Sequence, residues 1–242
     1  MKPFIFGSRS GIYIIDLQQT ERQLEAAYQF VEGVAARGEL TLFVGTKKQA
    51  KTIIEEQAIR CQMPYVITRW LGGTMTNFET IKKNITELIT LRQQREEGYF
   101  ERLSKRDAKR NERKIEQHEA HLSGLVSLNR LPACVYIIDP KREQNAVREA
   151  SRLSIPIVAI CDTNADPEPI AYPIPGNDDA IRSIRLITTR IAEAILAGRR
   201  RAGLPDGGEI KLLHDSEDTE EIAADAPAVP APTEQNGGES AA

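Results

Sequence analysis

The stretch LTLFVGTKKQAKTIIEEQAIR (residues 40–60) contains the pattern that decides the fold. Residues 40–44 form a short, largely apolar run, which is typical of a strand buried on both faces of a sheet. A single glycine, Gly45, follows this run, and residues 47–60 then have the periodicity of a helix. A strand that leads directly into a helix is the repeating unit of a parallel sheet covered by helices.

The same alternation continues through most of the chain. The other predicted strands are residues 11–17, 64–67, 133–139 and 155–162, and the other predicted helices are residues 20–37, 142–153 and 178–196. Thr20 and Gln23 are placed to form a capping box at the start of the first of these helices. With right-handed crossovers, this order predicts an α/β fold: a doubly wound, flavodoxin- or Rossmann-like parallel sheet.

One segment interrupts the alternation. Residues 78–128 contain no predicted strand, and their apolar residues recur at steps of three and four. Gly98 falls between the two periodic halves. This pattern predicts an inserted antiparallel helical hairpin that packs as a short coiled coil. The expected domains are therefore an α/β sandwich formed by residues 1–77 and 129–204, and a hairpin formed by residues 78–128.

The charge of the chain is distributed unevenly. The whole chain of 242 residues has a net charge of −3, but residues 206–242 hold ten acids and one lysine, for a net charge of −9. The remaining residues carry a net charge of +6. Because residues 205–242 are also rich in Ala, Pro and Gly, we expect a disordered acidic tail after a basic body.

The apolar runs and the cysteines indicate a cytoplasmic protein. The runs are far shorter than a membrane span, and the first residues have no apolar signal-peptide region. Three cysteines without a regular spacing suggest reduced thiols, and we expect them to be buried as small apolar residues.

Three basic segments are candidates for binding phosphate. Lys47 and Lys48 open the helix after Gly45, but one glycine is neither a dinucleotide fingerprint nor a Walker loop, so a nucleic-acid backbone fits at least as well as a nucleotide. In RWLGG (residues 69–73), Arg69 is placed to stack on a base or pair with a phosphate, whereas Trp70 suits core packing equally well. Residues 102–114 hold seven basic and two acidic residues, and four of the basic ones, at steps of four, three and four, form a continuous helix face: Arg102, Arg106, Lys109 and Arg113.

An enzyme remains the alternative. Asp162, Asp166, Asp178 and Asp179 lie in a Pro-rich loop region and have the ligand type that magnesium prefers. The same residues also suit turns and helix N-termini, which is the favoured interpretation. The sequence shows no arrangement of nucleophile and base. We therefore expect no catalysis, no metal and no cofactor, and we keep a nucleotide-binding enzyme that uses the Gly45 loop and these acids as the alternative.

Five motifs in order resemble one family. They are MKPFIFGSRSGIYIIDLQQT, LFVGTKKQA, RWLGGTMTNFETIKK, LPACVYIIDPKRE and IPIVAICDTNADPEPIAYPIPGNDDAIRSI. Together they resemble the bacterial small-subunit ribosomal protein S-two family over residues 1–198. The resemblance implies a doubly wound domain with a protruding helical hairpin and a structural role in the small ribosomal subunit. The implied partners are small-subunit ribosomal RNA, neighbouring ribosomal proteins and ribosomal protein S-one, through which the family supports translation initiation.

The candidate RNA-binding residues follow from the motifs and from the charge. On the motifs, they are Lys47, Lys48, Arg69, Trp70, Lys82 and Lys83. On charge, they are Arg106, Lys109, Arg110 and Arg113.

The sequence departs from the family pattern near its first residues. Family members usually have a further segment of a couple of dozen residues, with a helix and a His-Phe-Gly stretch, ahead of the region that matches residues 2–7. We therefore expect poorer packing near Phe4 and Phe6.

Overall fold

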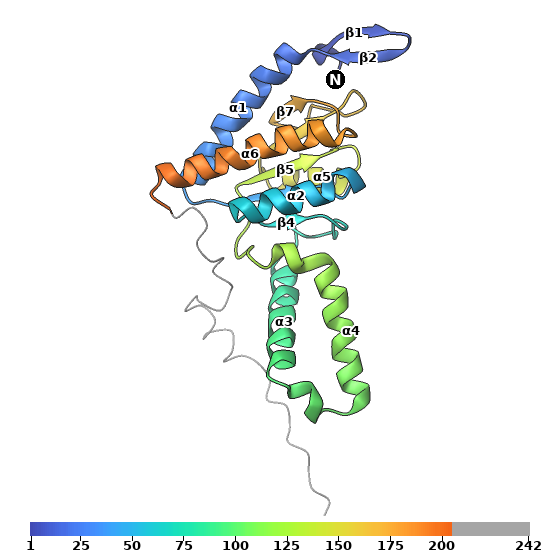
Figure 1. Ribbon diagram of the computed structural model, residues 1–242, viewed down its shortest axis with the longest axis vertical. Coiled ribbons are helices and arrows are strands. Elements are labelled where there is room, and N and C mark those ends of the chain that lie inside the picture. The colour runs from blue at the N-terminus through green and yellow to red at the C-terminus, as the bar shows by residue number, and fades with distance from the viewer. Residues whose placement is uncertain (205–242) are drawn as a thin grey trace, which may run out of the picture.

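The computed structural model describes residues 1–204 (Figure 1). Residues 205–242, for which we expect a disordered acidic tail, lie outside the described residues. The strands are β1 (Ile5–Arg9), β2 (Ile12–Ile15), β3 (Thr41–Val44), β4 (Tyr65–Val66), β5 (Cys134–Ile138), β6 (Ile157–Cys161) and β7 (Tyr172–Pro175). The α-helices are α1 (Leu17–Ala36), α2 (Lys48–Cys61), α3 (Phe78–Glu96), α4 (Lys105–Leu122), α5 (Gln144–Arg152) and α6 (Ile181–Arg201).

The central sheet confirms the predicted doubly wound fold. Five parallel strands lie in the order β4-β3-β5-β6-β7. The direction of winding reverses between β3 and β5, so the topological switch point lies where these two neighbouring strands end. In this class of fold the crevice at the carboxyl ends of such strands is the usual ligand site.

Alternating side chains divide the interior into two apolar layers. Phe43 and Tyr136 belong to the layer beneath α1, α2 and α6, and the Tyr136 hydroxyl lies 2.9 Å from the hydroxyl of Thr188 on α6. Leu42 and Val135, one position earlier on the same strands, belong to the other layer, which α5 and the base of the hairpin cover (Figure 1). Burial of both faces explains why these strands read as continuous apolar runs.

The helices α3 and α4 form the antiparallel pair that the sequence predicts, and they project away from the sheet (Figure 1). Gly98 adopts a positive φ of 70° after α3, a conformation that glycine tolerates well, and a short 3-10 helix (Tyr99–Arg102) completes the turn. The two helices bury an apolar seam composed of Ile81, Ile85, Leu88, Leu91, Ile115 and Leu122.

Three local features differ from the sequence-based expectation. Residues 5–9, for which the sequence predicts no strand, form β1 and pair with β2 across a turn in which Ser10 and Gly11 both have positive φ. The first helix begins at Leu17 with Asp16 as its N-cap, so the capping box predicted at Thr20 is wrong. The segment Tyr172–Pro175, expected to be part of a loop, forms β7.

The β1–β2 hairpin leaves apolar side chains in contact with solvent. Phe6 is 80% exposed, Ile12 71% and Leu17 75%, whereas Phe4 is half-buried. The hairpin lies at the end of the molecule opposite to α3 and α4 (Figure 1). The expectation of poor packing is therefore confirmed for Phe6.

The three cysteines are buried and unpaired, as expected. Burial raises the pKa of the Cys61 thiol to about 12, so this group stays protonated and unreactive at neutral pH. Among residues 1–204, no helix is both long and apolar enough to cross a membrane.

Candidate nucleic-acid interface

The outer face of α4 carries a cluster of exposed cations. Ser104 caps the helix by accepting a hydrogen bond from the backbone N–H of Asp107 at 3.2 Å, and Ile115 and Leu122 anchor its inner face. On the outer face, four exposed basic side chains help to line one shallow hollow of about 770 Å³; they are Arg106, Lys109, Arg110 and Arg113. We call this set the basic hairpin face. The structure thus brings together the four residues selected on charge.

The cations on the inner faces of α3 and α4, which face the other helix of the hairpin, form ion pairs. Lys114 Nζ lies 2.6 Å from Glu87 Oε1, and Arg92 Nε lies 2.9 Å from Glu119 Oε1, so both ion pairs join α3 to α4. The hydrogen bond from Lys114 lowers the pKa of Glu87. By contrast, no carboxylate in the described part of the chain forms an ion pair with the basic hairpin face, which leaves its charge available for an external anion.

The RWLGG loop at the root of the hairpin is held by one carboxylate. Glu149 Oε1 accepts hydrogen bonds from Trp70 Nε1 at 2.9 Å and from the Gly73 backbone N–H at 2.8 Å. Glu149 Oε2 accepts from the backbone N–H groups of Met75 and Thr76 at 3.0 and 3.1 Å, and from the Thr76 hydroxyl at 3.1 Å. Glu149 therefore fixes the loop against α5. Sequence reasoning missed this residue.

The same hydrogen bonds set the charge of Glu149. Partial burial acts to raise the pKa of its carboxyl, but the donors on Trp70, Thr76, Met75 and Gly73 outweigh this effect, and the net pKa is lowered. The group is therefore a carboxylate at neutral pH and can accept all five hydrogen bonds.

The candidate RNA-binding residues that were chosen on the motifs differ in how exposed they are. Trp70 is only 6% exposed and belongs to the apolar layer beside Met75, which favours a packing role over stacking on a base. Arg69, the residue before it, is exposed. Lys83 on α3 and Lys48 at the start of α2 are also exposed. Lys82 is half-buried, next to the buried Ile81 at the base of the apolar seam.

Lys47 is engaged by acids at the carboxyl edge of the sheet. Its Nζ lies 2.6 Å from Asp178 Oδ1, 2.6 Å from Asp179 Oδ1 and 3.5 Å from Asp139 Oδ2. Burial opposes the charge of Lys47, but the hydrogen bonds to Asp178 and Asp179 raise its pKa overall. Burial also raises the pKa of Asp178, and Lys47 acts in the opposite direction. This ion-pair cluster leaves Lys47 less available to RNA than Lys48.

Carboxylate oxygens of Asp162, Asp178 and Asp179 lie within 4.8 Å of one another. This is the part of the predicted acidic group that the fold gathers, and Asp166 is not a member. The ammonium group of Lys47 lies 2.6 Å from two of these three carboxylates and offsets part of their charge, so an internal ion-pair network accounts for the grouping.

Side chains of the protein itself fill the switch point between β3 and β5. The Thr46 hydroxyl and backbone N–H both bond to Glu143 Oε1, and Arg142 Nε donates to the Thr46 hydroxyl at 3.0 Å. Burial raises the pKa of Glu143. A Cβ at Gly45 would lie 3.0 Å from Ile54 Cγ1, so this glycine permits close helix packing. The loop is therefore built as a packed junction, which does not support the nucleotide alternative.

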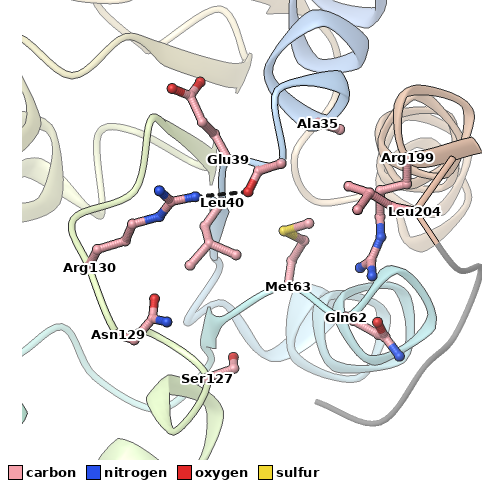
Figure 2. A pocket seen from close by; sticks show the side chains of 11 residues that line it. Ala35, Glu39, Leu40, Gln62, Met63, Ser127, Asn129, Arg130, Arg199 and Leu204 are labelled. Atoms are coloured by element: carbon pink, nitrogen blue, oxygen red, sulfur yellow. Dashed lines mark hydrogen bonds between the residues drawn. The ribbon is translucent and has the colours of Figure 1, made fainter. Parts of the chain in front are cut away.

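A different hollow, of about 410 Å³, lies at the amino-terminal edge of the sheet, close to Leu40 and Met63 (Figure 2). Arg130 donates to the backbone carbonyl of Gly38 at 2.9 Å, and Arg199 donates to that of Cys61 at 3.2 Å. These arginines bind chain carbonyls, so the hollow is a polar seam between connecting segments at the edge opposite to the usual ligand crevice.

Comparison with known proteins identifies the family. The profile described as ribosomal protein S2 matches residues 1–198. The chain belongs to the ribosomal protein S2 family. It is 56% identical over 199 residues to small ribosomal subunit protein uS2 of Dictyoglomus turgidum, a match that covers 82% of this chain and 81% of that relative. It is 53% identical over 201 residues to the uS2 protein of Chloroflexus aggregans, covering 83% and 84%.

A third relative matches beyond the family profile. The uS2 protein of Coprothermobacter proteolyticus is 48% identical over 225 residues, covering 92% of this chain and 84% of the relative. Membership in the S2 family makes this chain a structural protein of the small ribosomal subunit, with a place in translation, and not an enzyme. The alternative of a nucleotide-dependent enzyme is thereby set aside.

Proposed function

We propose that this S2-family protein binds small-subunit ribosomal RNA through the basic hairpin face of α4. The observation that carries the proposal is the grouping of Arg106, Lys109, Arg110 and Arg113 around one hollow, exposed and without a carboxylate partner in the described part of the chain. Cations on a solvated helix are commonly matched by acids. Here Glu119 and Glu87 pair with the inner cations Arg92 and Lys114, and Asp107, which also lines the hollow, accepts a hydrogen bond from the Ser104 hydroxyl. The four outer cations form no ion pair within residues 1–204.

The energetic argument is counterion release. Each cation that replaces a condensed ion on a nucleic acid adds about 0.7–0.9 to the steepness of the salt dependence, so four contacts give a slope of about −3. A helix holds the four side chains at fixed spacing, and the ion pairs to α3 hold that helix in place. The basic hairpin face is thus a rigid surface for a phosphate backbone.

Arg69 extends the proposed interface towards the sheet. It is exposed, and Glu149 fixes its neighbour Trp70. Lys83 lies one turn into α3 and Lys48 at the start of α2, both exposed. In this proposal Arg69, Lys48 and Lys83 contact RNA directly, while Trp70 and Lys47 shape the surface from within.

The second part of the proposal concerns ribosomal protein S-one. Exposed apolar side chains gather at the β1–β2 hairpin and the start of α1, with Phe6, Ile12 and Leu17 each more than 70% exposed. Several large apolar side chains that stay exposed close together in the chain are a feature of protein-binding sites. We assign the S-one contact to this end of the molecule, which lies opposite to the basic hairpin face (Figure 1).

Small subunits that lack this protein test both parts. The purified chain should co-sediment with such subunits, and a variant with alanine at positions 106, 109, 110 and 113 should be recovered with them in a clearly smaller amount. The substitutions Phe6→Ser and Ile12→Ser should leave this chain bound but reduce the S-one recovered with the subunits. Retention of the alanine variant at the parent level would contradict the RNA part, and undiminished S-one would contradict the second.

A further inference from the structure

A groove of about 790 Å³ runs along α5, on a different element from the basic hairpin face. The exposed positions Gln144, Arg148, Ser151 and Arg152 follow the helical spacing that places them on one side of α5. Ala146 and Ala150 pack the other side against the sheet. Residues of the loop after β6, Asn164 and Asp166 among them, form the opposite wall.

The charge of this groove is mostly positive and unmatched. Lys141, Arg148 and Arg152 line it, and no carboxylate in residues 1–204 forms an ion pair with any of them. Arg148 has only a 3.5 Å contact with the side-chain oxygen of Gln144. The one acid of the groove, Asp166, accepts a hydrogen bond from the backbone N–H of Glu168 at 3.1 Å and so serves its own turn.

We propose that this groove is a second binding site for the phosphate backbone of small-subunit ribosomal RNA, with Lys141, Arg148 and Arg152 as the contacting cations. The inference rests on the proposed RNA-binding function and extends it to the α/β domain. Three unmatched cations in a concave surface complement a polyanion. The apolar side chain of Val147 and the ring of Pro169 in the same groove suit contact with ribose.

The position of Glu149 gives this site its rigidity. Glu149 follows Arg148 directly in α5 and binds the RWLGG loop through five hydrogen bonds. The groove lies on α5 and the exposed Arg69 lies in the RWLGG loop, and the hydrogen bonds of Glu149 join these two segments. A rigid pair of surfaces loses little conformational entropy when it binds, which favours a specific RNA geometry.

The test is binding of the full chain to small-subunit ribosomal RNA assembled with its earlier-binding proteins, measured across a salt series. The groove variant carries Lys141→Ala, Arg148→Ala and Arg152→Ala. The matched control removes three exposed cations on other surfaces, through Lys2→Ala, Arg22→Ala and Arg182→Ala. Each protein's melting temperature is measured first, and all six positions are exposed, so the fold should persist.

We expect the groove variant to bind about a hundredfold more weakly than the parent at 0.1 M salt, with a salt slope that is shallower by about two units. A footprint of the RNA should lose protection at nucleotides that the hairpin variant still protects. Binding equal to the control would overturn the inference. Tighter RNA binding by the groove variant would overturn it as well, since removal of cations that contact a polyanion cannot strengthen its binding.

The outcomes separate this inference from the proposed function. If the hairpin variant loses affinity and the groove variant does not, the hairpin proposal stands and the second site is wrong. If the parent chain itself does not bind the assembled RNA, both fail.

Discussion

Trp70 Nε1 donates a hydrogen bond of 2.9 Å to Glu149 Oε1, and this contact joins two residues that are 79 positions apart in the sequence. It ties the loop at the root of the helical hairpin to the helix α5 on the sheet. The placement of the basic hairpin face relative to the α/β domain therefore depends on a carboxylate that lies outside that face.

Replacement of Glu149 by Gln should destabilise the protein by about 2–4 kcal/mol. The amide loses the charge, and in either orientation its NH2 group faces N–H donors that are left without an acceptor, those of Trp70 and Gly73 or those of Met75 and Thr76. Urea unfolding at pH 7 measures the effect. The exposed Glu116, changed to Gln, is the matched control and should alter the free energy of unfolding by less than about 0.5 kcal/mol.

The Glu149→Gln deficit should depend on pH in a defined direction. Because the folded-state pKa of Glu149 is lowered, its contribution is complete above the pKa of an unfolded glutamate, about 4.3, and is lost as the pH falls through the folded value. The difference between parent and variant should therefore shrink in acid. A difference that stays constant from pH 7 to pH 3 would show that the charge of Glu149 is unimportant.

Replacement of Lys47 by Met should destabilise the protein by about 3 kcal/mol at pH 7. Asp178 is only 2% exposed at its side chain and would lose its cation. Because the folded-state pKa of Asp178 is already raised, loss of Lys47 raises it further, and the deficit should decrease as the pH falls and this carboxyl protonates. Lys48→Met, at the exposed neighbour, should change stability little. Equal deficits at pH 7 and pH 4 would argue against the ion-pair network.

Replacement of Gly124 by Ala should disturb the point where the helical hairpin returns to the sheet, because Gly124 lies just after the end of α4. A Cβ there would overlap the backbone oxygen of Tyr65 on β4, so the chain would have to shift to accommodate it. We expect a loss of stability of about 1–3 kcal/mol and weaker RNA binding. In Gly33→Ala, the new Cβ meets only Arg37 Nη1 at 3.8 Å within a helix, so this control should be neutral or stabilising by up to about 1 kcal/mol. Thermal unfolding of both variants measures the effect. Equal melting temperatures of the two variants would contradict the prediction.

Much of this architecture follows from the sequence, and the exceptions have physical reasons. The strands β3, β5 and β6 are buried on both faces and read as apolar runs. By contrast, β7 has the sequence YPIP, and two prolines argue against a strand. The prolines are tolerated because β7 lies at the edge of the described sheet and pairs with β6 on one side only. The strand β1 was missed because its sequence, IFGSR, has only two apolar residues and gains its pairing from β2.

The candidate site likewise has residues that the sequence predicts and residues that it does not. Helical spacing is a local property, so the face formed by Arg106, Lys109 and Arg113 could be read directly from the sequence. The pairing of Lys47 with Asp178 and of Trp70 with Glu149 depends on which loops the fold brings together across the sheet. No local pattern marks these partners, and the burial of Trp70 follows from them.

The central claim is that the basic hairpin face binds ribosomal RNA. The most direct test is equilibrium binding of the parent chain and of a variant with Arg106→Ala, Lys109→Ala, Arg110→Ala and Arg113→Ala to small-subunit ribosomal RNA assembled with its earlier-binding proteins, across a salt series. We predict tight binding by the parent with a steep salt slope, and a slope shallower by about three units in the variant. Parent and variant with the same affinity and the same slope would contradict the account.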